Sequence, residues 1–351
     1  MSIDLAAIAA SIPGLDLAAM DAARQRQAQL TKPPGSLGRL EELAIALAGM
    51  TGTERPRLEH AAVVVAAADH GIAARGVSAY PREVTRQMVL NFLAGGAAIS
   101  ALARNAGARV IVADFGVAGE AISHPKLVSA RQGEGTHDFL DGPAMLVETA
   151  LDAIAAGMAI VERERVAGLD VVCTGEMGIG NTTSAAALTA AFTGAPAATV
   201  TGHGTGVQGE AFAHKLRVVE DALARHVEPG TAPIELLARL GGFEIAGLTG
   251  VILAAAANRL PVILDGYITT AAALAAVAIA PGARNFLVAS HRSVEPGHRA
   301  ALTALGLVPL VDLSLRLGEG SGAAVALPIL RGALAAHNEM ATFAEAAVSE
   351  A

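Results

Sequence analysis

The sequence predicts an α/β fold in which helices cover both faces of a doubly wound, mostly parallel sheet, with a small helical domain beside it. Short apolar runs alternate along the chain with helix-like segments, which is the order that right-handed β–α–β crossovers produce. The apolar runs are continuous, as expected for parallel strands that are buried on both faces. Most of them end in a polar residue, and such strand ends meet at one edge of a parallel sheet. We therefore expect one large site along that edge.

The predicted elements alternate along the chain. The expected strands are residues 61–68, 109–113, 170–173, 261–264, 285–289 and 308–311. Helical segments are expected at residues 85–105, 144–164, 185–192, 210–226 and 271–280. The two terminal segments are also helix-like. We therefore expect a large α/β domain over residues 55–320 and a small helical domain that residues 1–54 and 321–351 form together.

The composition argues against several classes of function. A net charge of −8 without clusters of lysine or arginine argues against a nucleic-acid partner. The most apolar tract, residues 271–280, is far shorter than the about 20 residues that a membrane span requires. The N-terminal segment contains Asp4 and no basic region before its apolar residues, so no signal peptide is expected. Because Cys173 is the single cysteine, we expect a cytoplasmic protein without an internal disulfide.

The segment from Thr174 to Ser184, TGEMGIGNTTS, carries the strongest functional signal. It follows a predicted strand and leads into a predicted helix, whose N-terminal N–H groups can bind an anion. Its glycine spacing resembles a P-loop, but Asn181 occupies the position of the triphosphate-binding lysine, so a monophosphate is expected. A glycine-rich turn without a ligand is the alternative. The residues expected to bind phosphate here are Gly175, Gly178, Gly180, Asn181, Thr182 and Thr183.

A second glycine-rich segment, residues 315–322, places Glu319 between glycines directly before an apolar helix. A carboxylate in apolar surroundings, with only Arg316 as a cationic neighbour, has a raised pKa and can act as a general base. A solvated loop residue, or a charge at the helix N-terminus, is the alternative. The local sequence leaves both interpretations open.

Residues 76–88 mix hydrogen-bonding side chains with flat or soft apolar ones. Ser78, Tyr80, Gln87 and Met88 together suit a planar heteroaromatic ligand, although Pro81 also indicates a simple helix start. Two further polar loops, residues 201–206 and 290–298, could hold phosphate. No metal ion is expected, because the chain has no His-Glu-x-x-His pattern and no second cysteine.

Eight segments occur in a fixed order between about residues 30 and 330: LTKPPGSLGRLEELA, AADHGI, GVSAYP with VTRQM, NFLAGGAAI, GEMGIGNTT, LDGYITTAAALAA, SHRSVEPGH and LRLGEGSGAA. Together they resemble the nicotinate-nucleotide–dimethylbenzimidazole phosphoribosyltransferase family. The resemblance implies transfer of phosphoribose from nicotinate mononucleotide to 5,6-dimethylbenzimidazole in cobalamin synthesis, which releases nicotinate and forms α-ribazole 5′-phosphate. It further implies a Rossmann-like fold, a homodimer and an enzyme that needs neither a cofactor nor a metal ion.

The same resemblance implies roles for individual residues. Glu319 matches the family's catalytic glutamate, a general base in a reaction that inverts C1′, and Glu176 and Lys215 support charge near the acceptor ring. Tyr80 stands where the family usually has phenylalanine. The base pocket is implied at Ser78, Tyr80, Gln87 and Leu317. Besides the glycine loop, the nucleotide site is implied at Gly202, His203, Gly204, Thr205, Gly266, Ser290 and Ser293.

Two rival functions are open. A non-catalytic nucleotide sensor could share this fold, but such a protein has no need of Glu319. A phosphotransferase or NTPase could use the glycine loop, but Asn181 replaces the lysine and no partner for magnesium is evident. The sequence therefore favours the transferase over both.

Overall fold

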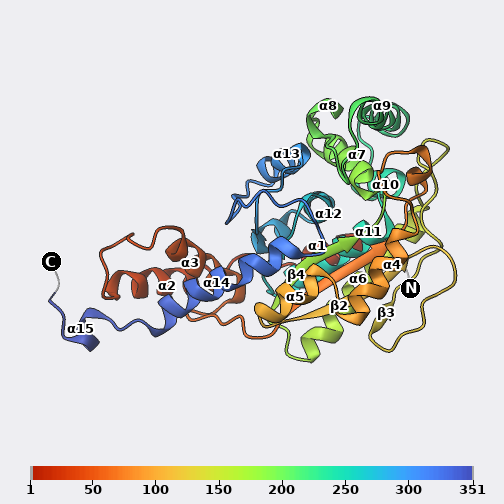
Figure 1. The fold of residues 1–351 in the computed structure, drawn as a ribbon. Helices are drawn as coiled ribbons and strands as arrows, with labels where there is room; N and C mark the ends of the chain where they lie inside the picture. Colours follow the sequence, from red (N-terminus) through yellow and green to blue (C-terminus); the bar gives the residue numbers. More distant parts are fainter. Residues whose placement is uncertain (1–2, 350–351) are drawn as a thin grey trace.

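The computed structural model describes residues 3–349 and contains a six-stranded sheet in which all neighbouring strands are parallel (Figure 1). The strand order is β3-β2-β1-β4-β5-β6. This arrangement confirms the predicted doubly wound α/β fold, with a sheet that is parallel throughout. In chain order the strands are β1 (Ala61–Ala68), β2 (Ala108–Gly116), β3 (Leu127–Ser129), β4 (Val171–Met177), β5 (Val262–Leu264) and β6 (Leu287–Ala289).

Apolar runs located most strands but not their full lengths. β1 has the predicted bounds, whereas β2 and β4 continue through polar residues beyond the predicted ends. β3 was missed, because this edge strand has three residues and none of them is fully buried. The prediction of a strand at residues 308–311 is wrong. The structure has only an isolated bridge there, between Val311 and His291. Pro309 lacks the N–H that a sheet ladder needs, and Val308 is exposed.

Helices connect the strands and form both terminal segments. In chain order they are α1 (Leu5–Ser11), α2 (Leu17–Gln29), α3 (Arg39–Thr51), α4 (Val84–Ala94), α5 (Ala98–Asn105), α6 (Val147–Val166), α7 (Asn181–Thr193), α8 (Ala197–Val200), α9 (Gly209–His226), α10 (Pro233–Leu240), α11 (Phe243–Ala257), α12 (Tyr267–Ile279), α13 (Pro296–Ala304), α14 (Ser321–Glu339) and α15 (Phe343–Ala346). Two 3₁₀ helices, η1 (Gly71–Arg75) and η2 (Pro281–Phe286), complete the described elements.

One predicted helix is divided in the structure, and the helices α8, α10, α11 and α13 were not predicted. The single helix expected over residues 85–105 is divided into α4 and α5, because Gly95 adopts a left-handed conformation, with φ of +77°, that ends α4. α11 was missed because it is buried on every side. Its apolar run therefore lacks the 3.6-residue period that marks a surface helix.

Helices cover both faces of the sheet, as predicted. The α4–α5 connection leads from β1 to β2, whereas α6 leads in the opposite direction, from β3 to β4. Right-handed crossovers therefore place α5 and α6 on opposite faces. α11 packs against α6 and the sheet, and α14 packs against α5, β4 and β5. The central strand β1 is consequently buried over all 8 residues.

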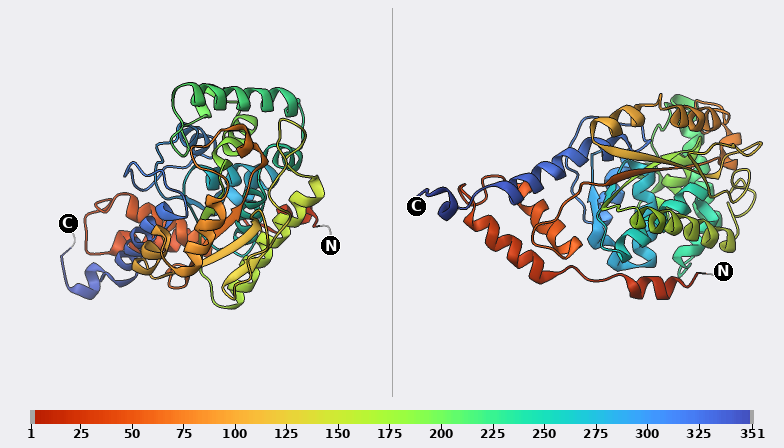
Figure 2. Two further views of the ribbon diagram at one scale, coloured as in Figure 1. Left: turned by 45° about the vertical axis from the view of Figure 1, so that its right-hand side comes forward. Right: turned by 90° about the horizontal axis from the view of Figure 1, so that it is seen from below.

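Of the terminal helices, α2, α3 and α14 lie together on one side of the sheet (Figures 1 and 2). α3 packs against both α2 and α14. Arg26 of α2 donates hydrogen bonds to the carbonyl groups of His337, Asn338 and Met340 at the end of α14. α1 packs instead against α11. The division into domains of residues 55–320 and of 1–54 with 321–351 stays a prediction, and residues 1, 2, 350 and 351 lie outside the described part.

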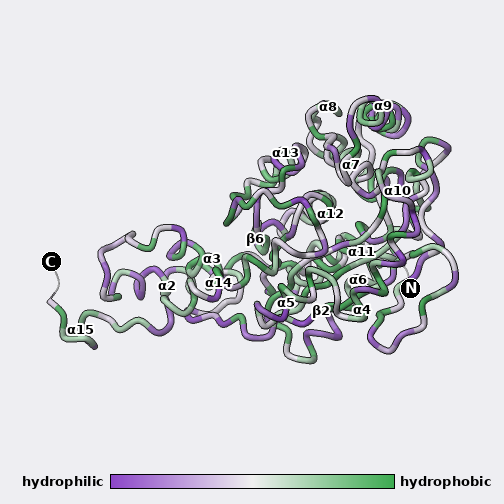
Figure 3. Tube along the Cα trace, in the orientation of Figure 1, coloured by the Kyte–Doolittle hydropathy of each residue, from purple (hydrophilic) through white to green (hydrophobic). Residues whose placement is uncertain are grey.

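The distribution of hydropathy follows these layers. Figure 3 shows hydrophilic and hydrophobic residues mixed along α9, which lies at the rim of the molecule. α11, by contrast, is buried against the sheet. Within residues 3–349, no helix has the length and apolar character needed to cross a bilayer.

Replacing Gly157 with alanine should destabilise the protein. α6 and α11 approach so closely that a Cβ atom at Gly157 would overlap the carbonyl group of Gly247. Overpacking of this kind lowers the free energy of unfolding by about 1–3 kcal/mol. The matched control is Gly332→Ala in α14, where a Cβ atom would meet nothing within 4 Å and should raise that free energy by about 0.5–1 kcal/mol. Urea unfolding measures the free energy of unfolding of both variants. Equal values for the two would contradict the close approach of α6 and α11.

Candidate active site

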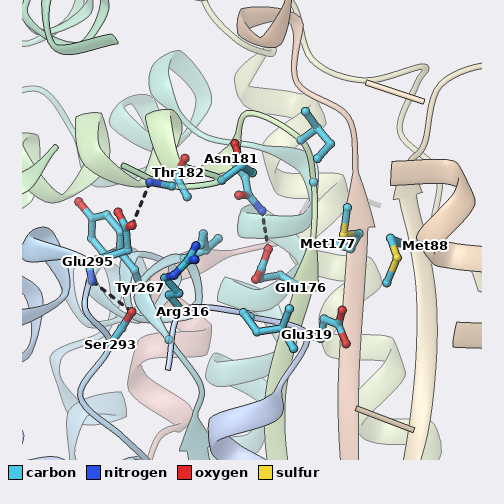
Figure 4. A pocket seen from close by; sticks show the side chains of 18 of the residues that line it. Met88, Glu176, Met177, Asn181, Thr182, Tyr267, Ser293, Glu295, Arg316 and Glu319 are labelled. Atoms are coloured by element: carbon cyan, nitrogen blue, oxygen red, sulfur yellow. Dashed lines mark hydrogen bonds between the residues drawn. The ribbon is translucent and has the colours of Figure 1, made fainter. Parts of the chain in front are cut away.

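A cavity of about 540 Å³ opens at the carboxyl edge of the sheet. It lies at the end of β4, beside the point between β1 and β4 where the strand order reverses. Open parallel sheets bind their ligands at such a reversal. Its walls, shown in part in Figure 4, consist of Tyr80, Val84, Met88, Glu176, Met177, Gly178, Ile179, Asn181, Thr182, Gly204, Thr205, Gly266, Tyr267, Ile268, His291, Ser293, Glu295, Arg316, Leu317, Gly318 and Glu319.

The glycine loop between β4 and α7 forms one wall of this cavity. Gly180 precedes α7 with φ of +97°, and α7 has no side-chain cap at its N-terminus. A Cβ atom at Gly178 would lie 2.5 Å from the carbonyl oxygen of Ala68, so only glycine fits against β1. The wall therefore combines a helix N-terminus with the side chains of Asn181 and Thr182, which suits an anion.

Glu176, at the end of β4, is a buried acid that keeps its proton at neutral pH. Burial raises the pKa of Glu176 to about 8, and the carboxyl groups of Asp265, Glu244 and Glu319 add to the rise. The Asn181 side-chain amide opposes it by donating a hydrogen bond to Glu176 Oε2 at 2.5 Å. Asn181 therefore holds Glu176 at the cavity wall.

Glu319 lies in a turn between α14 and the loop that precedes it. Its backbone φ of +64° is left-handed, as are those of Gly318 and Gly320. Its Oε2 accepts the N–H of Ile99, in the first turn of α5, at 3.3 Å. Burial raises the pKa of Glu319, the Ile99 N–H opposes this, and the Asp265 carboxyl adds to it. In Figure 4, Glu319 lines the same side of the cavity as Met88 and Met177.

The side of the cavity opposite Glu319 is supported by a buried lysine and by a further carboxylate. Lys215 of α9 is fully buried, and its Nζ donates to Thr182 Oγ1 at 2.9 Å. Burial lowers the pKa of Lys215 to about 8, against the attraction of Glu295. Glu295 Oε1 accepts the N–H of Gly204 at 2.9 Å. Glu295 Oε2 is buried against Gly202 and has no hydrogen-bond partner among residues 3–349.

The structure brings many of the expected site residues to the cavity wall. They are Glu319, Glu176, Tyr80, Met88, Leu317, Gly178, Asn181, Thr182, Gly204, Thr205, Gly266 and Ser293. The others do not line the cavity. These are Ser78, Gln87, Gly175, Gly180, Thr183, Lys215, Gly202, His203 and Ser290.

Most of the residues outside the wall support it from behind. Ser78 Oγ lies 3.0 Å from Thr205 Oγ1, and a Cβ atom at Gly175 would lie 2.5 Å from the Glu319 carbonyl oxygen. Gly180 packs against Ala73, Gly202 lies against Glu295, and Thr183 and Ser290 are buried. Two residues point elsewhere: Gln87 is exposed on α4, and the His203 ring packs against the Phe212 ring in a tilted arrangement, with 4.7 Å between centroids.

Sequence reasoning missed several polar groups at the cavity. Glu295 and Tyr267 line it without having been singled out, His291 lines it as part of a loop expected to hold phosphate, and Asp265 lies directly behind the turn of Glu319. Asp265 carried a signal as a polar strand end, but so did the ends of other strands. Glu295 lies in a loop expected to hold phosphate, where a carboxylate is not an expected ligand. Among residues 3–349, no group of three or more His, Cys, Asp or Glu side chains is arranged to hold a metal ion.

Comparison with known proteins places the chain in a family. A family model described as a phosphoribosyltransferase matches residues 12–348. The chain is 56% identical, over 336 residues that cover 96% of each protein, to the nicotinate-nucleotide–dimethylbenzimidazole phosphoribosyltransferase of Chloroflexus aurantiacus. The chain belongs to this phosphoribosyltransferase family. The Deinococcus radiodurans protein of the same name is 55% identical over 339 residues, which cover 95% of this chain and 92% of that protein.

A crystal structure of the family member from Thermus thermophilus has the same fold. It superposes with a TM-score of 0.92 at 50% sequence identity, and the match covers 96% of this chain and 100% of that chain. Similarity of this extent, over the whole catalytic fold, shows that the chain is an enzyme, a phosphoribosyltransferase. This assignment replaces the sensor and the phosphotransferase interpretations.

Replacing Glu176 with glutamine should make stability less sensitive to alkaline pH. Because the folded pKa of Glu176 is about 8 rather than 4.5, the folded state retains this proton and the unfolded state releases it. The contribution of this proton to the free energy of unfolding is fully present below pH 4.5 and is lost as the pH rises towards 8. Glu176→Gln should therefore gain stability relative to wild type over this interval, by on the order of 3–5 kcal/mol.

Urea unfolding between pH 5 and 9 measures this difference. The amide oxygen of the introduced glutamine can still accept the Asn181 hydrogen bond, so packing changes little. The matched control is Glu220→Gln on the exposed side of α9, which should follow the wild-type pH dependence. If the free energy of unfolding changed with pH in the same way for Glu176→Gln and for wild type, Glu176 would be ionised in the folded protein.

Proposed function

We propose that this enzyme transfers 5-phosphoribose from nicotinate mononucleotide to 5,6-dimethylbenzimidazole, forming α-ribazole 5′-phosphate for cobalamin synthesis and releasing nicotinate. The observation that carries this proposal is one cavity that joins Glu319 to a glycine loop without the P-loop lysine. The names of the relatives, which specify nicotinate nucleotide and dimethylbenzimidazole, support it.

The phosphate of the mononucleotide binds at the N-terminus of α7. Gly178, Asn181 and Thr182 line the cavity there, and Gly204 lies against Thr182 beside the lining residue Thr205. Lys215 supports this wall with positive charge through its hydrogen bond to Thr182. A single phosphate needs no lysine that spans two phosphates, which accounts for Asn181 at that position.

The acceptor ring binds on the apolar side, close to Glu319. Tyr80, Met88, Met177 and Leu317 provide flat and polarisable surface there. Ser78 contributes through Thr205, and Gln87 belongs to the same helix as Met88. Glu176, protonated at neutral pH, can donate a hydrogen bond to a ring nitrogen.

The chemistry is a direct displacement at C1′ of the ribose. The lone pair of one benzimidazole nitrogen forms the new bond to C1′ while the bond from C1′ to the nicotinate ring nitrogen breaks. The electron pair of that bond returns to the nicotinate ring and cancels its positive charge, so no acid is needed for departure. Glu319 takes the proton from the other benzimidazole nitrogen. Attack opposite to the leaving group inverts C1′, which turns a β-nucleotide into an α-nucleotide.

Three further features of the protein belong to the same proposal. We infer a homodimer and a small domain formed by both termini from the family resemblance, and a cytoplasmic location from the single cysteine, Cys173. Light scattering of the purified protein measures the first of these.

Replacing Glu319 with glutamine should leave a folded protein that binds both substrates and has lost most of its turnover. Loss of a general base lowers kcat by about 10²–10⁴-fold. Steady-state kinetics and calorimetric binding of nicotinate mononucleotide separate the two effects. The exposed control Glu220→Gln should keep wild-type kcat. Near-normal turnover of Glu319→Gln would remove Glu319 as the base.

Nicotinate release from nicotinate mononucleotide should depend on 5,6-dimethylbenzimidazole. The expected product is an α-linked nucleotide, identified by NMR of its anomeric proton. Release that is independent of the acceptor would indicate hydrolysis, and a β-linked product would contradict the single displacement.

A further inference from the structure

The carboxylate of Asp265 binds the backbone on the C-terminal side of Glu319. Its Oδ2 accepts the N–H of Gly320 at 3.0 Å, and its Oδ1 accepts the N–H groups of Gly322 at 2.7 Å and Ala323 at 3.3 Å. α14 begins at these residues and has no side-chain cap of its own. A residue at the end of β5, 55 positions earlier in the chain, therefore caps this helix.

The turn that Asp265 holds is one that the chain would not adopt by itself. Gly318, Glu319 and Gly320 have successive φ values of +85°, +64° and +92°. A left-handed conformation is open to glycine but costs a residue such as glutamate about 1 kcal/mol or more. Below the turn, a Cβ atom at Gly320 would lie 2.5 Å from Val63 Cγ1. The turn is therefore held between the sheet and the Asp265 carboxylate.

Asp265 is itself fixed by two neighbouring strands. Its backbone N–H donates to Thr174 Oγ1 of β4 at 3.2 Å. Its carbonyl oxygen accepts the hydroxyl of Ser290, after β6, at 3.2 Å. The side chain is 1% exposed and does not line the cavity. Asp265 can therefore transmit the position of the sheet to the turn without touching a ligand.

We propose that Asp265 is a positioning residue for Glu319, because its carboxylate fixes the left-handed turn that directs the Glu319 side chain into the cavity. From this turn the Glu319 carboxylate reaches the N–H of Ile99, at 3.3 Å. The inference rests on the proposed role of Glu319 as the base. Asp265 itself lies outside the cavity lining and contacts neither substrate.

Asp265→Asn tests this role with little change in shape. One amide oxygen replaces two carboxylate oxygens, so the amide NH₂ group must face one of the three N–H groups. We expect kcat to fall by about 10–100-fold, with the KM for nicotinate mononucleotide within about threefold of wild type, since the change affects an interaction used in the reaction rather than in binding. A larger rise in KM than fall in kcat would overturn the proposal.

Asp114→Asn is the matched control. Asp114 lies in β2, is also buried, and its Oδ1 accepts the N–H groups of Gly116 at 2.9 Å and Val117 at 2.7 Å, but it does not line the cavity. This variant should lose stability and keep kcat. An equal fall in kcat for both variants would make Asp265 a purely structural residue.

A double-mutant cycle with Glu319→Gln separates the two roles. If Asp265 acts through Glu319, Asp265→Asn should lower kcat by less than about threefold further once Glu319 is glutamine. Fully multiplicative losses would overturn the positioning role. A Glu319→Gln enzyme with wild-type turnover would instead refute the base, which distinguishes failure of the proposed function from failure of this inference.

A second pair of variants keeps the test valid should Asp265→Asn not fold. Thr174→Val removes the oxygen that accepts the Asp265 N–H, whereas Thr174→Ser retains it. We expect Thr174→Val to lower kcat several-fold at unchanged KM and Thr174→Ser to match wild type. Equal kcat values for the two variants would count against the proposal.

Discussion

The burial of three carboxyl groups at the carboxyl edge of the sheet is the constraint on which this site depends. Glu176, Asp265 and Glu319 come from separate segments, and each is at most 6% exposed. Such groups are stable away from water only where hydrogen-bond donors replace it. Asn181 supplies one donor to Glu176, and the first turns of α5 and α14 supply N–H groups to Glu319 and Asp265. The acids are therefore held where helices begin.

The reversal of strand order brings these helix starts together. Crossovers leave β1 and β4 towards opposite faces of the sheet, so the connections above these two strands diverge and leave a crevice. Close backbone approaches then narrow it. Gly178 passes the Ala68 carbonyl and Gly175 lies under the Glu319 carbonyl, each at a distance that leaves no room for a side chain. The anion-binding loop and the turn of Glu319 consequently share one cavity.

α14 connects this cavity to the terminal helices. It begins at the turn that Asp265 holds and runs for 19 residues to the carbonyl groups that Arg26 binds. Between these ends it packs against α5, α3 and two strands of the sheet. The helix that follows Glu319 is therefore held at both ends, by a strand end and by the N-terminal segment.

The sequence by itself determined the parallel sheet and the glycine loop before α7, because continuous apolar runs and glycine spacing are local patterns. It left the role of Glu319 open until the family resemblance was considered. Local patterns also explain the errors, since α11 is apolar on all sides, β3 is short and Gly95 interrupts a helical period. Only the tertiary structure decided that Asp265 caps α14 and that Glu295 meets Gly204, contacts that join residues 55 and 91 positions apart. Burial and hydrogen bonding between such distant segments arise from packing, which no local pattern in the chain records.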